Sequence, residues 1–178
     1  MKSIIFCVLF GFSSVVFSQG KINWMTMNEA LEAQKESPKK IVMDVYTIWC
    51  GPCKLMDKNT FSNPKVVDFI NKNYYPVKFN AEGTEEITYE GFTYTNPNYQ
   101  PERKGRNAVH FFADALRLQG YPSLVFFEED GKLIQAVPGY KTPQELEIYL
   151  KMIANDDYKA LTTMEAWENY QKDFKGTF

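Results

Sequence analysis

The stretch that decides the fold is VYTIWCGPCKLMDKNTF, residues 45–61. It contains two cysteines, Cys50 and Cys53, with a glycine and a proline between them. Two cysteines at this spacing can bind a metal ion, attach haem, lock a turn or exchange disulfides with other molecules. The residues around the pair, and the rest of the chain, decide between these uses.

Metal binding and haem attachment both lack the ligands that they need. A structural zinc site takes four ligands, whereas the chain has a single histidine, His110, and no second pair of cysteines. Covalent haem attachment requires a histidine directly after the second cysteine, and position 54 is a lysine. We therefore expect no metal site and no cofactor, and we interpret the cysteines as chemically active.

The local sequence favours thiol chemistry. Residues 41–47 have the composition of a buried strand and the pattern after Cys53 is helical, so Cys50 should lie at the amino end of a helix. Unpaired N–H groups and the helix dipole stabilise a thiolate there, which makes Cys50 the expected nucleophile. Cys53 is placed to attack the resulting mixed disulfide. Gly51 leaves room for a substrate, and Pro52 suits a first helical turn.

Two neighbours of the cysteines have two interpretations each. Trp49 could shield the nucleophile or offer a docking face to a substrate, or it could be a core aromatic at the end of a strand. Asp44 lies among apolar strand residues, where a carboxyl group is costly unless it is partnered or protonated. Its pKa should then rise into a range that suits acid–base work, unless it lies near the strand end and reaches water.

The first 18 residues have the features of a secretory signal peptide. Lys2 is followed by an apolar run and then by Ser18, a small residue suited to a cleavage site. We expect a periplasmic or secreted protein, with an uncleaved anchor as the alternative. The apolar run is shorter than the ~20 residues that span a bilayer, and no later segment qualifies, so no membrane insertion is expected after signal removal.

Composition argues against several classes of partner. The chain of 178 residues carries 20 Lys and Arg against 22 Asp and Glu, and the basic residues are scattered. This distribution does not favour nucleic acid or an anionic membrane surface. A protein with only two cysteines after signal removal also differs from disulfide-scaffold proteins, which have more.

The remaining pattern predicts an α/β domain with a mixed central sheet and helices on both faces. The expected elements are a short strand at 22–24, helices at 26–36, 53–58 and 63–70, strands at 41–47 and 75–80, a helix at 107–118, a hairpin at 123–139 and a helix at 142–153. We assign residues 19–153 to this domain and 154–178 to a C-terminal helical extension with a helix at 163–175. Residues 82–106 lack a sustained period and are interpreted as an insertion with a small hairpin around Glu90 and Gly91.

The motif WCGPCK resembles the active site of thioredoxin, and the element order over about residues 22–153 resembles the thioredoxin fold. The segment after the cysteines departs from thioredoxin because it breaks at residues 61–64, which is more similar to exported thioredoxin-like proteins with a split helix. The insertion at 82–106 and the helix after residue 155 have no counterpart in thioredoxin. The partners of thioredoxin therefore cannot be carried over to this chain.

The resemblance implies roles for further residues. Asp44 matches a buried acid that helps move the proton of the second cysteine, and Lys78 matches a lysine beside that acid. The sequence GYPS at residues 120–123 is similar to the family's Gly-x-Pro-Thr, which makes Pro122 the expected cis-proline opposite the disulfide. The backbone of Tyr121 would then pair with an extended substrate.

The resemblance also implies an activity, namely thiol–disulfide exchange between a redox-active Cys50–Cys53 disulfide and protein thiols. The Gly-Pro dipeptide favours a reducing member, which outside the cytosol would need electrons from a membrane reductase. A disulfide oxidase or isomerase is the first alternative. A binding module that uses the 82–106 insertion is the second, although its aromatic residues could equally pin the loop to the domain; these are Tyr89, Phe92, Tyr94 and Tyr99. For His110 we expect a position on a helix surface, and for residues 128–130 a solvated turn.

Overall fold

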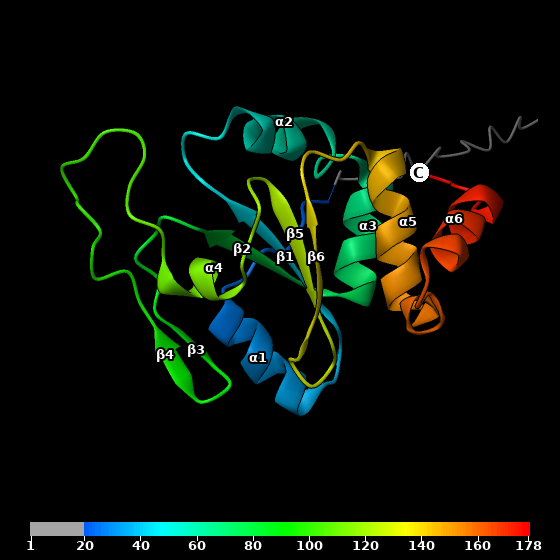
Figure 1. Ribbon diagram of the computed structural model, residues 1–178, viewed down its shortest axis with the longest axis horizontal. Coiled ribbons are helices and arrows are strands. Elements are labelled where there is room, and N and C mark those ends of the chain that lie inside the picture. The colour runs from blue at the N-terminus through cyan, green and yellow to red at the C-terminus, as the bar shows by residue number, and fades with distance from the viewer. Residues whose placement is uncertain (1–19) are drawn as a thin grey trace, which may run out of the picture.

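The computed structural model describes residues 20–178, so the predicted signal peptide at residues 1–18 lies outside the described part of the chain (Figure 1). In chain order the elements are α1 (Met27–Glu36), β1 (Ile41–Tyr46), α2 (Gly51–Asn59), α3 (Pro64–Asn73), β2 (Tyr75–Asn80), β3 (Ile87–Tyr89), β4 (Phe92–Tyr94), α4 (Phe111–Ala115), β5 (Ser123–Phe127), β6 (Leu133–Pro138), α5 (Pro143–Ala154), the 3-10 helix η1 (Asp157–Ala160) and α6 (Met164–Asp173). Within this part of the chain, no helix is long and apolar enough to cross a membrane.

The central sheet is mixed, as predicted. Its strand order is β2-β1-β5-β6; β1 and β2 are parallel, whereas β5 is antiparallel to both β1 and β6. In this register Asp44 of β1 lies opposite Lys78 of β2 on one side and Leu124 of β5 on the other. The two residues that the resemblance pairs are thus neighbours in the sheet.

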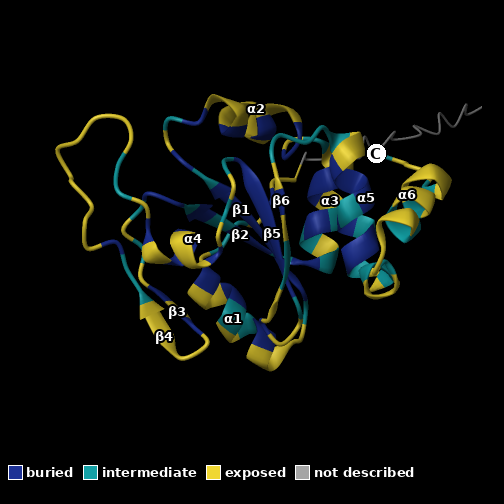
Figure 2. Ribbon diagram, viewed as in Figure 1, coloured by how far each residue is buried: buried dark blue, intermediate teal, exposed yellow. Residues whose placement is uncertain are grey.

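Each face of the sheet carries its own hydrophobic core, because successive strand residues point to opposite faces. Ile41, Met43 and Val45 of β1 pack on the side of α1 and α4. Val42 packs with α3 and α5 on the other side, and Asp44 shares its alternation. Figure 2 shows the resulting pattern, with buried strands in the centre and exposed residues on the outer helix surfaces.

Capping residues set the helix boundaries that the sequence predicted. Thr26 and Glu29 form a capping box at α1, and Thr142 and Glu145 form another at α5. Asn63 caps α3, whose first residue is Pro64, so the split between α2 and α3 is confirmed.

The expected strand at residues 22–24 is wrong. Residues 22–24 form no strand, and the one isolated bridge in the described part of the chain joins the next residue, Met25, to Val77. The side chain of Asn71 accepts from the Asn23 N–H at 3.0 Å and donates to the Lys21 carbonyl at 2.9 Å. These backbone groups are satisfied by a side chain, so a strand partner is not needed there.

The helix expected at 107–118 is shorter than predicted, since α4 spans only Phe111–Ala115. The backbone before it is used in tertiary contacts: the His110 N–H donates to Ala81 O at 2.8 Å, and Ala108 O accepts from Asn96 at 2.8 Å. The surface position expected for His110 is also wrong, because its side chain is fully buried. His110 Nδ1 accepts from the Phe112 N–H at 3.0 Å and caps α4.

The insertion forms the predicted hairpin and then a long exposed loop. Strands β3 and β4 pair around Glu90 and Gly91, which both have positive φ. Tyr89 and Tyr94 pack their rings 5.4 and 5.3 Å from that of Phe112 and pin the hairpin to the domain. Residues 97–106 are exposed and project from the body in Figure 1.

The C-terminal extension packs on α5, as its position beside that helix in Figure 1 shows. The rings of Tyr149 on α5 and Trp167 on α6 lie 5.6 Å apart. The turn at residues 128–130 is more than a solvated turn, because Glu128 accepts a hydrogen bond from the Tyr158 hydroxyl in η1. The extension is therefore held both to a helix and to the hairpin.

Candidate active site

The two cysteines form a disulfide at the junction of β1 and α2. Cys50 is the N-cap of α2, and its Sγ accepts a hydrogen bond from the Cys53 N–H at 3.1 Å. This N–H belongs to the first helical turn and has no partner within the helix, so it and the helix dipole stabilise a negative charge on the sulfur. On reduction, Cys50 is thus the better placed of the two sulfurs to carry a thiolate.

Access to the disulfide is narrow. Cys50 and Cys53 are each 2% exposed. Gly51 and Pro52 between them are exposed, and a Cβ placed on Gly51 would meet no other segment of the described chain within 4 Å. The open surface beside the disulfide is therefore that of these two residues.

Asp44 is buried below the active-site helix, with 1% of its surface exposed. Its Oδ2 receives the Lys78 ammonium at 2.6 Å, whereas Oδ1 has no hydrogen-bond partner among the described residues. Burial raises the pKa of Asp44 to about 6, and the attraction of Lys78 only partly opposes this. The carboxyl group can therefore take up or release a proton near neutral pH.

Lys78 bridges two carboxylates, and the sequence did not predict the second of them. Asp57, one turn after Cys53 on α2, also forms an ion pair with Lys78. Burial lowers the pKa of Lys78, but the two carboxylates outweigh it and leave that pKa above its ordinary value. Three aromatic rings surround the ammonium at 5.0 to 5.4 Å, those of Trp24, Tyr46 and Phe61. The spacing of four residues between Cys53 and Asp57 was the signal that could have identified Asp57.

Trp49 is held at the rim of the site by the insertion. Its Nε1 donates to Glu82 Oε2 at 2.9 Å, and the Arg106 guanidinium carbon lies 4.3 Å from the centre of its ring. Glu82 is only 5% exposed and Trp49 is partly exposed. Trp49 is thus a rim residue rather than a core aromatic, and neither Glu82 nor Arg106 was identified from the sequence.

Tyr121 and Pro122 lie beside Trp49. The Tyr121–Pro122 peptide bond is cis, and the Pro122 carbonyl accepts from the Gly139 N–H at 2.8 Å. The rings of Tyr121 and Trp49 meet edge to face with centres 6.3 Å apart. The backbone N–H and C=O of Tyr121 make no backbone hydrogen bond with any residue from 20 to 178, so both are free to pair with another chain.

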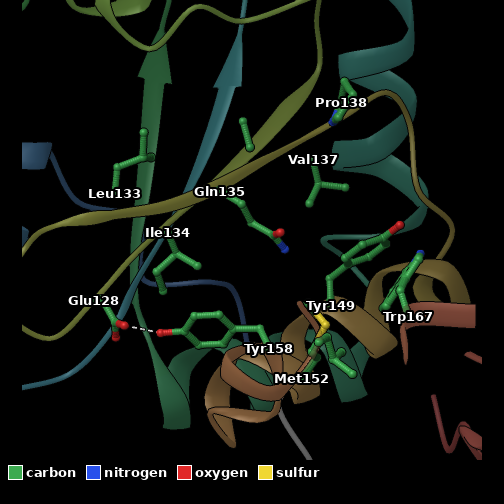
Figure 3. A pocket seen from close by; sticks show the side chains of 12 residues that line it. Glu128, Leu133, Ile134, Gln135, Val137, Pro138, Tyr149, Met152, Tyr158 and Trp167 are labelled. Atoms are coloured by element: carbon green, nitrogen blue, oxygen red, sulfur yellow. Dashed lines mark hydrogen bonds between the residues drawn. The ribbon is translucent and has the colours of Figure 1, made fainter. Parts of the chain in front are cut away.

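A cavity of about 510 Å³ lies away from this group of residues, between the outer strand β6 and the C-terminal extension. Figure 3 shows Tyr149, Met152 and Trp167 on the helical side and Ile134 on the strand side. No residue of the disulfide site lines it. Across the described range, no three or more His, Cys, Asp or Glu side chains gather as metal ligands would.

Comparisons with known proteins agree with this geometry. The family model for a thioredoxin-like domain matches residues 27–154. The thiol-disulfide oxidoreductase ResA of Bacillus thuringiensis subsp. konkukian is 26% identical, with 85% of this chain and 94% of ResA aligned. The thiol:disulfide interchange protein DsbD of Pectobacterium atrosepticum is also 26% identical, but the match covers 72% of this chain and only 18% of DsbD.

Solved structures show the same fold. A thioredoxin-fold protein from Helicobacter pylori superposes with a TM-score of 0.57 at 16% identity, over 76% of this chain and 81% of that one. A thioredoxin from Thermus thermophilus gives 0.55 at 17% identity, over 75% and 88% of the two chains. Since the matched range, residues 27–154, contains the whole central sheet and the Cys50–Cys53 disulfide, the chain belongs to the thioredoxin-like domain family.

Proposed function

We propose that this thioredoxin-like oxidoreductase reduces disulfides in proteins outside the cytoplasm, with Cys50 and Cys53 as its redox pair. The observation that carries the proposal is the Cys50–Cys53 disulfide at the start of α2, with a buried carboxyl group of pKa about 6 in the strand before it. The sequence of residues 1–18 supports export, and disulfide chemistry suits compartments where disulfides persist.

The reaction starts from the dithiol form. The Cys50 thiolate attacks one sulfur of a substrate disulfide; a mixed disulfide forms and one substrate thiolate leaves. The Asp44 carboxylate then accepts the proton of the Cys53 thiol. The Cys53 thiolate attacks Cys50 Sγ, the second substrate thiolate leaves, and the Cys50–Cys53 disulfide remains. Two electrons have passed to the substrate, so a reductase or another dithiol must return them.

The rim residues bind the substrate in this scheme. The free backbone groups of Tyr121, next to the cis-proline Pro122, pair with an extended substrate segment. Trp49 and the exposed surface of Gly51 and Pro52 form the floor along which that segment lies. Lys78 holds Asp44 in place and keeps its pKa from rising further.

Trapping of the intermediate tests the exchange reaction. In the Cys53→Ser variant the mixed disulfide at Cys50 cannot resolve, so a substrate protein should stay attached until a reductant is added. The Cys50→Ser variant is the control and should trap nothing at that position. Failure of Cys53→Ser to form any mixed disulfide with a disulfide substrate would contradict the proposal.

The reducing direction has its own test, because an oxidase or an isomerase would use the same residues. The pair should be equilibrated with glutathione buffers of known ratio, and the oxidised fraction measured by thiol alkylation. A reductase should have a potential well below the ER range of about −180 to −210 mV. A potential within that range would instead favour the oxidase or isomerase.

A further inference from the structure

The insertion returns to the active site at Arg106. The Arg106 guanidinium group lies over the ring of Trp49, 4.3 Å from its centre, and Trp49 directly precedes Cys50. Arg106 is exposed and forms no ion pair with any residue between 20 and 178. A guanidinium group that stacks on an aromatic face keeps the N–H donors at its edge available to another molecule.

The position of Arg106 is fixed by its neighbours. Glu82 Oε2, which is buried, accepts from both Trp49 Nε1 at 2.9 Å and the Asn107 N–H at 2.8 Å. The Asn107 side chain accepts from the Gln100 N–H at 2.9 Å and donates to Gln100 O at 2.8 Å, so it closes the base of the exposed loop. Arg106 therefore stands at a defined place beside the nucleophile although the loop before it is exposed.

The loop has a charge opposite to that of the chain as a whole. Residues 97–106 contain three basic side chains, Arg103, Lys104 and Arg106, and one acidic side chain, Glu102, whereas the chain has an excess of acidic residues. All ten are exposed, and Figure 2 shows the loop standing clear of the domain. The Glu82 carboxylate, which shares Trp49 with Arg106, is buried and already bonded to Trp49 and Asn107.

We infer that Arg106 determines substrate specificity by binding a carboxylate of an Asp or Glu that flanks the reacting cysteine of the substrate protein. The Tyr121 ring contacts the Trp49 ring, so a substrate segment paired with the Tyr121 backbone passes Trp49. A side chain of that segment then meets the edge of the Arg106 guanidinium group, which lies over Trp49. An arginine binds a carboxylate through two parallel charge-assisted hydrogen bonds. This inference rests on the proposed function, because it concerns the substrate of the same exchange reaction.

The role of Arg106 can be tested with two disulfide-containing peptides that differ only in having Asp or Asn beside the cysteine. The dithiol form of the wild-type protein should reduce the Asp peptide with a kcat/KM about threefold to fivefold higher at low ionic strength, a size typical of an exposed ion pair. The preference should fall toward one at an ionic strength of about 0.5 M, because exposed charges are screened there.

Variants assign the preference to Arg106. Arg106→Gln should bring the Asp-to-Asn ratio close to one, and Arg106→Lys should keep part of it because the charge remains without the planar fork. Lys172→Gln removes the same charge from an exposed position on α6 and should keep the wild-type ratio.

The outcomes separate this inference from the proposed function. Equal reduction of the two peptides by the wild-type protein would overturn the role of Arg106 while leaving the exchange activity intact. A preference that Arg106→Gln retains would also overturn it. If neither peptide is reduced, the proposed function fails and the inference fails with it.

Discussion

Asp44 in the sheet and Glu147 on α5 are two buried carboxyl groups with opposite behaviour. Asp44 is 1% exposed and Glu147 is fully buried. One oxygen of Asp44 has no partner among the described residues, whereas both oxygens of Glu147 accept from the Thr177 N–H, at 2.6 and 2.7 Å. Glu147 also receives the Phe178 N–H at 2.9 Å and the Lys151 ammonium at 2.6 Å.

The difference in partners decides the charge at neutral pH. Burial raises the pKa of Asp44 to about 6, and Lys78 opposes this only in part. Burial would likewise raise the pKa of Glu147, but its hydrogen bonds from Lys151, Phe178 and Thr177 outweigh burial and lower it. Burial alone therefore does not determine acid strength. Asp44, with one unbonded oxygen, is available for proton transfer. Glu147, with both oxygens bonded, is an anion that holds Thr177 and Phe178.

Removing Glu147 should have the largest effect on stability. Glu147→Ala removes the acceptor of the Thr177 and Phe178 N–H groups and the ion-pair partner of Lys151, and we expect a loss of about 3–5 kcal/mol in the free energy of unfolding. Urea unfolding at pH 7 measures it, with Glu168→Ala on the exposed face of α6 as the matched control. A loss no larger than that of the control would show that the bonds to the chain end contribute nothing.

Removing the charge of Asp44 should increase the free energy of unfolding, whereas removing Glu147 should decrease it. The folded pKa of about 6 lies above the ordinary value of 3.8, so ionisation in the native state costs stability as the pH rises through this interval. Asp44→Asn should therefore stabilise the protein by up to about 3 kcal/mol above pH 6 and give no gain below pH 3.8.

The same variant should slow the reaction. Release of the second substrate thiolate needs the Cys53 proton to be removed, and we expect a decrease of at least about tenfold in that step near pH 7. Stopped-flow measurement of mixed-disulfide resolution gives the rate directly. An unchanged rate, with the stability gain present, would show that Asp44 is a strained structural residue and not the proton acceptor.

His110 extends the comparison to a buried base. Burial lowers its pKa below 6.5, and protonation would remove the Nδ1 acceptor that caps α4. Its contribution to stability is thus complete above pH 6.5 and is lost as the pH falls toward the folded pKa, by about 1 kcal/mol. His110→Asn keeps a capping acceptor without a titrating ring, so urea unfolding at pH 7 and pH 5 should differ less in this variant than in the wild type.

The smallest effect should come from Asp57. Its negative charge makes the weakest of the contributions to the Asp44 pKa, and it raises that pKa. Asp57→Asn also leaves Lys78 paired with Asp44 alone, so we expect a small downward shift of the Asp44 pKa. An NMR titration of the Asp44 carboxyl carbon measures it, and an upward shift would contradict the arrangement of charges described above.

Features set by neighbouring residues could be predicted from the sequence. The strand–Cys-x-x-Cys–helix unit, the capping boxes at Thr26 and Thr142 and the turn around Gly131 depend on contacts within a few residues, and all of them formed. The burial of Asp44 followed from the apolar residues on both sides of it. These local units lead to the fold because a mixed sheet with helices on both faces buries the apolar side chains of all of them.

Features set by distant residues could not be predicted. The Trp49 to Glu82 hydrogen bond spans 33 residues, and the Glu147 side chain looks like any exposed helical glutamate until residues 177 and 178 cover it. The helix expected from residue 107 fails for the same reason, because Ala81 and Asn96 take its backbone groups. Periodicity in the sequence predicts helices and strands, but it does not identify hydrogen-bond partners that are distant in the chain.

At Gly51, the stability of the domain and the access of the substrate can be changed independently, although these two demands usually compete in an active site. Because a Cβ there would meet no other segment of residues 20–178 within 4 Å, this residue can be enlarged at little cost to the domain. In the proposed exchange reaction, each added atom would instead occupy space that the substrate enters. Position 51 is therefore the place where the range of accepted partners can be narrowed while the scaffold is left alone.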